Sequence, residues 1–442
     1  MEKMKKGIKT IIERINEFFN CLSNSFFSFL KNYDTKIYLL IITFISLILR
    51  FSLFNCVRGD YTNFLKPWYQ RIYEGGFTSL GQSFGDYTPS YYYLLYFISL
   101  FKFDSESIYV LWGIKTISII CDYVIGVFVA LIVYHLTRDK IKSILAYFFT
   151  IFGLTVFLNS SLWGQCDSIY SSFCIISLYY LLKDKPNKAM IFYGFAFCFK
   201  LQSIFFLPVI IVFYLRQKMK LRSLLWVIVI YSLLAIPSCL ASDNFFNRFL
   251  EIWAVYFNQS ANSYKQLTLN AGTFYAMIFT NFKAEEYISS FALFLSIGII
   301  GTYIFLIYRS KVEFNSIIWA KVATLFLLVV PYFLPHMHER YFYLADVVVI
   351  IYALINPKKF YVAILAILNS MIGYMVYLWN IPFINVVPQE EVDYTKAMSF
   401  RFGAIIYLIA IIFVSIDLFK QIYPNGLKES EKGEVEDGCK RI

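Results

Sequence analysis

Long apolar stretches, each bounded by charged or turn-forming residues, recur along the whole chain of 442 residues. Stretches of about 20 apolar residues are long enough to cross a hydrocarbon core of about 30 Å as helices. Splitting the sequence at its charge clusters and turns predicts about twelve transmembrane helices. The predicted spans are residues 37–55, 107–135, 143–159, 168–182, 189–199, 202–215, 223–241, 288–308, 316–335, 341–355, 360–380 and 402–419. The pattern therefore predicts an all-α polytopic membrane protein.

The composition supports this class. Hydrophobic residues make up 59% of the chain and charged residues 16%, whereas soluble domains have about 45–50% and about 25%. The mean hydropathy is +0.60. These values exclude a soluble enzyme, a secreted disulfide-stabilised domain and a disordered regulator.

Lysine and arginine gather in short clusters between the apolar stretches, and the net charge is +11. If the predicted spans alternate in direction, all the clusters fall on one side of the membrane. They are Lys3 to Lys36, Arg138 to Lys142, Lys183 to Lys188, Arg216 to Arg222, Arg309 with Lys311, Lys358 with Lys359, and Lys420 to Arg441. Because basic loops stay in the cytoplasm, we expect this side and both termini to be cytoplasmic. The membrane would be the plasma membrane in a bacterium or the endoplasmic reticulum in a eukaryote.

The predicted topology divides the chain into three parts. Residues 1–36 carry apolar positions at helical spacing between charges, which predicts an amphipathic helix at the cytoplasmic surface. Residues 37–419 form the transmembrane bundle. Residues 420–442 are polar, which predicts a disordered cytoplasmic tail.

Two long outer loops, residues 56–106 and 242–287, follow from the same topology. The apolar stretch 91–101 inside the first loop is short for a crossing and predicts a helix lying in the membrane interface. Residues 189–215 must form two short spans that meet near Lys200 at the outer face. A charged residue within an apolar stretch is tolerated where the backbone breaks inside protein.

Acidic residues at the predicted outer boundaries are candidates for function, because carboxylates near a membrane are costly. Asp60 follows the first span, and Asp86 precedes the interfacial stretch. Each lies in a Gly-Asp-Tyr triplet, the second of which contains Tyr87. Gly-Asp also favours an ordinary turn, so a purely structural role is the alternative for either residue.

Two further outer turns carry polar side chains. Trp163, Gln165 and Asp167 bring an indole, an amide and a carboxylate to one turn. Tryptophan at an interface is often an anchor, but anchoring does not explain the two polar neighbours. Lys200 and Gln202 lie at the next outer break, where the lysine could instead extend along the membrane surface.

Two of the three histidines lie in one short segment, which contains His336, His338, Glu339 and Arg340. A metal site needs a further ligand at suitable spacing, and none follows nearby. Histidine and arginine at an interface favour binding of an anionic head group such as a phosphate. Simple anchoring at the interface is the alternative.

Lys115 and Asp122 lie seven residues apart in the predicted span 107–135. This separation is about two helical turns, so the two side chains share a face. We expect them to form a structural polar pair inside the bundle.

Taken in order, these motifs resemble the GT-C superfamily of membrane glycosyltransferases, which use a polyprenyl-phosphate sugar as donor. The most similar members are bacterial proteins related to the GPI mannosyltransferase that adds the second mannose, and the N-glycan glucosyltransferases are a more distant match. The resemblance covers about residues 50 to 345. It rests on Gly-Asp-Tyr at Asp60, Asp-Tyr-x-Pro from Asp86, Lys115-x₆-Asp122, Trp163-Gly-Gln-x-Asp167, Lys200-x-Gln202, Leu269-Asn270-Ala271 and His336-x-His338-Glu-Arg-Tyr.

The resemblance implies a GT-C-like bundle with interfacial helices in the first outer loop. It implies an inverting hexosyltransferase that moves a sugar, mannose or glucose among the possibilities, to a glycan or glycolipid acceptor at the outer membrane face. Asp60 would be the catalytic base, and Lys200, His336, His338 and Arg340 would contact the donor phosphate. Substrate contacts are expected from Asp86, Tyr87, Trp163, Gln165, Asp167, Gln202, Asn270 and Glu339. No cofactor and no nucleic acid are expected, and the motifs leave dependence on a divalent metal open.

Elementary chemistry agrees with these roles. A carboxylate at the outer surface can accept the proton of an acceptor hydroxyl, while cations stabilise the departing phosphate. Two other classes compete. A flippase or transporter of lipid-linked sugars would carry charges distributed through its spans, and a polysaccharide polymerase or ligase would usually place its large outer loop late in the chain.

Overall fold

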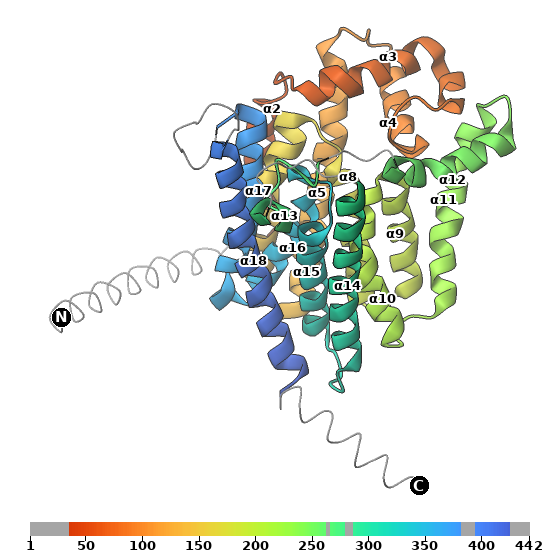
Figure 1. Ribbon diagram of the computed structural model, residues 1–442. Helices are drawn as coiled ribbons and strands as arrows, with labels where there is room; N and C mark the ends of the chain where they lie inside the picture. The colour runs from red at the N-terminus through yellow and green to blue at the C-terminus, as the bar shows by residue number, and fades with distance from the viewer. Residues whose placement is uncertain (1–34, 262–265, 279–285, 382–393, 425–442) are drawn as a thin grey trace.

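The computed structural model describes residues 35–261, 266–278, 286–381 and 394–424 (Figure 1). The predicted N-terminal helix and most of the predicted disordered tail therefore lie outside the described residues. The described elements are helices apart from one short parallel pair, β1 (Thr268–Leu269) with β2 (Met337–His338). The all-α class is confirmed to within these two strands.

Each of the twelve predicted spans is helical over most of its length. The corresponding elements are α2 (Thr35–Phe51), α5 (Ile108–Thr137), α6 (Lys140–Ile151) with α7 (Leu154–Phe157) and the π-helix η3 (Leu158–Trp163), α8 (Asp167–Leu182), α9 (Pro186–Phe199), η4 (Leu201–Phe206) with α10 (Leu207–Leu215), η5 (Leu221–Leu224) with α11 (Leu225–Leu240), α14 (Glu286–Arg309), α15 (Ser316–Phe333), η6 (Glu339–Phe342) with α16 (Tyr343–Ile355), η7 (Pro357–Lys359) with α17 (Tyr361–Trp379), and α18 (Tyr394–Ile422).

Six helices within the described ranges are long and apolar enough to cross a membrane. A seventh is added if α6 and the segment α7–η3, which meet at an angle of 46°, count as one bent span. The chain is therefore a multi-pass membrane protein, and twelve crossings stay a prediction. The bend also corrects the expected span 143–159, because the helix turns at Gly153 and continues to Trp163.

The first predicted outer loop forms a helical layer across one end of the bundle (Figure 1). It contains η1 (Tyr61–Leu65), α3 (Lys66–Gly75), η2 (Gly76–Gly81) and α4 (Pro89–Ser99). Pro67 and Pro89 stand in the first turns of α3 and α4, where the missing N–H of proline costs no helical hydrogen bond. The helix predicted at residues 91–101 is α4. The second predicted loop contains α12 (Phe245–Ala261) and α13 (Phe274–Ile278).

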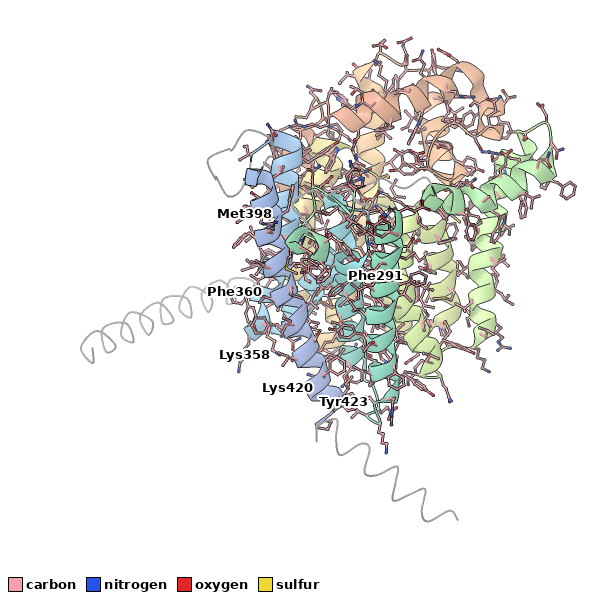
Figure 2. All side chains as sticks on the ribbon, in the orientation of Figure 1. Phe291, Lys358, Phe360, Met398, Lys420 and Tyr423 are labelled. Carbon is pink, nitrogen blue, oxygen red and sulfur yellow. The ribbon has the colours of Figure 1, made fainter. Side chains whose placement is uncertain are left out.

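Basic junctions meet at the other end of the bundle. The Arg216 guanidinium, after α10, donates to the Val312 carbonyl at 2.5 Å between α14 and α15. Lys359 pairs with Asp417 near the end of α18, and Figure 2 shows Lys358 and Lys420 at the end away from α3 and α4. That this end faces the cytoplasm stays a prediction.

The polar pair expected within α5 is wrong. Asp122 pairs with Arg50 of α2 at 2.6 Å, and both side chains are fully buried. Lys115 instead donates to the carbonyl oxygens of Leu53, Phe54 and Cys56, beyond the end of α2, at 2.8 to 3.1 Å. Seven residues of helix rise about 10 Å, which favours partners on neighbouring elements for both side chains.

Candidate active site

Asp60 lies directly before η1, and its carboxylate accepts hydrogen bonds from four side chains. Oδ2 accepts from the indole Nε1 of Trp163 at 2.9 Å and from Nη1 of Arg340 at 3.2 Å. The amide of Gln165 donates to the same oxygen, and the hydroxyl of Tyr377 donates to Oδ1 at 3.1 Å. The Asp60 side chain is 15% exposed. Three distant parts of the chain therefore converge on one partly exposed carboxylate.

The turn after η3 places two of these donors. Gly164 has a φ of 77°, a left-handed conformation that glycine adopts without the steric cost of a Cβ. The backbone N–H of Gln165 then closes the turn by donating to the Asn159 carbonyl at 2.9 Å. As a result Trp163 and Gln165 both reach Asp60. π-Helical turns such as η3 are rare and are often found at functional sites.

A second ion pair lies beside the first. Lys200 donates to Oδ1 of Asp167, and both side chains are buried. Oδ2 of Asp167 accepts from the Asn159 amide at 3.1 Å and lies 4.0 Å from Nε of Arg340. The charges therefore alternate through Asp60, Arg340, Asp167 and Lys200.

Local backbone geometry explains the position of Lys200. Its φ of −156° and ψ of 138° are extended, so helix α9 ends there and the side chain leaves the helical path. The predicted break between two short helices is thereby confirmed. The next element, η4, begins directly after it.

Aromatic rings surround the two cations. The Lys200 ammonium lies 5.5 Å from the ring centre of Tyr341 and 5.8 Å from that of Tyr87. The Arg340 guanidinium lies 5.6 Å from Trp163 and 5.8 Å from Tyr341. These distances fall within the range of cation–π attraction. Lys200 is buried, and burial strengthens its charge interaction with Asp167.

Burial and charge shift the pKa values of groups at this end. Burial by itself lowers the pKa of Arg340, but neighbouring groups, Asp60 and Asp167 among them, raise it well above its usual value. Burial also lowers the pKa of His336, against a smaller effect of its hydrogen bond to Gln266. Arg340 is therefore a permanent cation, whereas His336 is neutral near pH 7.

The two histidines occupy different places. His336 has a φ of 63°, and its Nδ1 is hydrogen-bonded to the Gln266 carbonyl at 2.7 Å, before β1. His338 lies in β2, and its ring centre is 5.1 Å from that of Tyr341, which contacts both cations. The structure therefore places His338 beside the charged cluster, while the described contacts of His336 lead to the segment before β1.

Four other predicted site residues form no described hydrogen bond with Asp60. Glu339 is 1% exposed, and neither of its carboxylate oxygens accepts a hydrogen bond from a described residue. The Oε1 atom of buried Gln202 likewise has no described partner. Asn270 has a left-handed φ of 53° directly after β1. Asp86 is exposed, and the described contacts do not join it to Asp60.

Sequence reasoning missed several members of the cluster. Tyr377 donates to Asp60, and its ring stacks on that of Trp163 with centres 4.8 Å apart. Tyr374 contacts the edge of Trp163 and bonds with Asn159. Both tyrosines lie near the end of a predicted span, where aromatic residues are common as interfacial anchors. Only their contacts with Asp60, Trp163 and Asn159 in the folded protein distinguish them from such anchors.

No protein-family model matches this sequence, and a comparison with curated proteins finds no significant similarity. Within the described ranges, no group of three histidine, cysteine, aspartate or glutamate side chains is placed to hold a metal ion. The site geometry and the sequence motifs are therefore the basis for any statement of function.

Proposed function

We propose that this chain is a GT-C-like membrane glycosyltransferase that transfers a hexose from a polyprenyl-phosphate sugar to a hydroxyl group, with inversion. One observation carries the proposal. The carboxylate of Asp60 lies 3.2 Å from the guanidinium of Arg340, both side chains are partly exposed, and Asp167 links Arg340 to buried Lys200. A base and two cations in one cluster suit transfer of a group away from phosphate.

The chemistry divides between Asp60 and the cations. The acceptor oxygen attacks the anomeric carbon as the bond from that carbon to the phosphate oxygen breaks, and Asp60 takes the hydroxyl proton. The phosphate, a singly charged diester in the donor, leaves as a monoester that carries more negative charge. Arg340 and Lys200 stabilise this developing charge, and Arg340 can do so through two parallel hydrogen bonds.

In this arrangement the Asp60 carboxylate is already bound by four hydrogen-bond donors. These donors occupy the oxygens that must accept the proton of the acceptor hydroxyl. A donor phosphate that binds Arg340 would compete with Asp60 for the guanidinium. Donor binding would thereby release the base near the atom that needs it, which favours binding of the donor before the acceptor.

The proposal is tested by reconstituting the purified protein in lipid vesicles. Polyprenyl-phosphate mannose and polyprenyl-phosphate glucose serve as donors, and octyl glycosides serve as acceptors. We expect transfer from one donor, with inverted anomeric configuration in the product by NMR. A product with retained configuration, or transfer undiminished in Asp60→Asn, would contradict the proposed mechanism.

The buried charges inside the bundle favour a second candidate, a flippase or transporter of lipid-linked sugars. Arg50 and Asp122 pair within it, and Asp346 is 1% exposed with Oδ2 lacking a described partner. Intramembrane charges often mark transport pathways. Vesicles loaded with the same lipid donors separate the two functions, since a transporter would move the donor across the bilayer without forming a glycoside.

A further inference from the structure

The buried ion pair between Arg50 and Asp122 lies at the meeting point of four elements. Nη1 of Arg50 donates to Oδ2 of Asp122 at 2.6 Å, to Ser160 at 2.7 Å and to Ser161 at 3.1 Å. The Tyr343 hydroxyl donates to Oδ1 of Asp122 at 2.6 Å. The network therefore joins α2, α5, η3 and α16.

Three of these elements lead directly to the candidate site. The chain continues from Arg50 in α2 to Asp60. Ser161 in η3 comes two positions before Trp163, and Arg340 comes three positions before Tyr343. Each of the three site residues, Asp60, Trp163 and Arg340, therefore lies within ten positions of a network member along the chain.

The network also contacts the bend between α6 and α7. Nη2 of Arg50 donates to the Ile151 carbonyl at 2.8 Å, at the last residue of α6. Carbonyl groups in the last turn of a helix lack intrahelical partners, so this contact caps α6 where the chain turns toward Trp163. The fixed fork of a guanidinium makes such a set of contacts specific in direction.

We propose that Arg50, Asp122 and Tyr343 are positioning residues that hold Trp163 and Arg340 against Asp60. A charge pair in an apolar interior cannot be rehydrated if it moves, so its geometry tolerates little displacement. The link between these residues and sugar transfer rests on the proposed function. The effect of the network on the environment of Trp163 is independent of that function.

The chain supplies a closely matched control on the same helix. Tyr343 and Tyr352 both lie in α16 with fully buried side chains. Tyr343 donates to Asp122 at the site end, whereas Tyr352 donates at 2.9 Å to Asp417, whose carboxylate pairs with Lys321 at the other end. Replacing either tyrosine by phenylalanine removes one hydroxyl bound to one paired carboxylate.

The experiment uses the full chain, with 5-fluorotryptophan at its seven tryptophan positions, in lipid nanodiscs. The Trp163 fluorine signal is assigned by its loss in Trp163→Phe. We expect Tyr343→Phe to shift this signal by more than its line width and Tyr352→Phe to leave it in place. Asp122→Asn should shift it in the same direction as Tyr343→Phe. Thermal unfolding of each variant establishes that it is folded.

A Trp163 signal that moves in neither tyrosine variant, or equally in both, would overturn the proposal. Activity provides the second readout. We expect Tyr343→Phe to lower kcat by up to about 10²-fold through misplacement of the reacting groups, with little change in KM. If the signal shifts as expected but wild-type protein transfers no sugar, the positioning network stands and the proposed function fails.

Discussion

Arg340 and Asp60, which are 280 positions apart in the chain, form an ion pair with 3.2 Å between Nη1 and Oδ2. The same guanidinium lies 4.0 Å from Asp167 through its Nε. Two carboxylates therefore already interact with the guanidinium that the proposed mechanism assigns to the donor phosphate. Any phosphate that binds Arg340 must compete with them.

This competition predicts opposite effects on binding and turnover in Asp60→Asn. Loss of the base should reduce turnover by about 10²–10⁴-fold. Loss of the negative charge should strengthen binding of polyprenyl phosphate, because Arg340 no longer pairs with residue 60. Transfer rates and calorimetric binding of polyprenyl phosphate, measured on the same vesicles, check the two effects separately.

Asp86→Asn is the matched control, since Asp86 is exposed and lies in the second Gly-Asp-Tyr triplet of the same loop. We expect it to leave phosphate affinity near the wild-type value. Weaker phosphate binding in Asp60→Asn than in the wild type would show that Asp60 and the phosphate do not share Arg340.

Arg340→Lys should impair the proposed sugar transfer although it preserves the charge. An ammonium lacks the planar fork that can bind two phosphate oxygens through parallel hydrogen bonds. We expect kcat/KM to fall by about 10²–10³-fold, as when one donor to a developing charge is removed. Arg71 is an exposed arginine of the first predicted outer loop, and its guanidinium donates to Gln82, so Arg71→Lys should change kcat/KM little. Equal losses in both variants would argue against a special role for Arg340.

A side chain at Gly164 should strain the turn and destabilise the protein. Its φ of 77° would strain an alanine by about 1–2 kcal/mol, although the nearest atoms leave room for the Cβ. Gly298 lies in helix α14 with open space around it, so alanine there should stabilise the helix by up to about 1 kcal/mol. Chemical unfolding of Gly164→Ala and Gly298→Ala in micelles measures both changes. Destabilisation by both substitutions to the same degree would refute the backbone argument.

His336 should make the fold sensitive to acid. Burial lowers its pKa in the folded state, so the unfolded chain binds more protons below about pH 6.5. The stability contributed by neutral His336 is complete above that pH and is lost as the pH falls toward the folded-state pKa. His336→Asn keeps a residue that tolerates a left-handed φ.

The melting temperature should therefore fall less in His336→Asn than in the wild type between about pH 7.5 and about pH 5.5. Scanning fluorimetry at both values makes the comparison. An equal fall in the two proteins would mean that other groups account for the acid sensitivity.

The helices themselves could be predicted from local pattern. Each of the twelve apolar stretches is helical, and the break at Lys200 and the short helix α4 lie where charge and stretch length indicated. The predicted ends of the helices are less accurate. For example, α18 begins at Tyr394 rather than at residue 402. Hydrophobic periodicity is a local property of the sequence, so it predicts a helix without information about the helices that pack against it.

Membership of the candidate site could be predicted only in part. Residue type at a predicted outer boundary points to Asp60, Trp163, Gln165 and Arg340, and the structure brings these four side chains together. Tyr377 was not, because its hydroxyl gains meaning only from the carboxylate opposite it.

The buried pair of Asp122 shows where local reasoning ends. The sequence alone determined that α5 carries two charged residues on one face, and that each needs a partner inside the bundle. Tertiary packing selected Arg50 for Asp122 and the carbonyls beyond α2 for Lys115. A buried charge binds the partner that its neighbours can bring within about 3 Å, and those neighbours are set by how helices distant in sequence pack together.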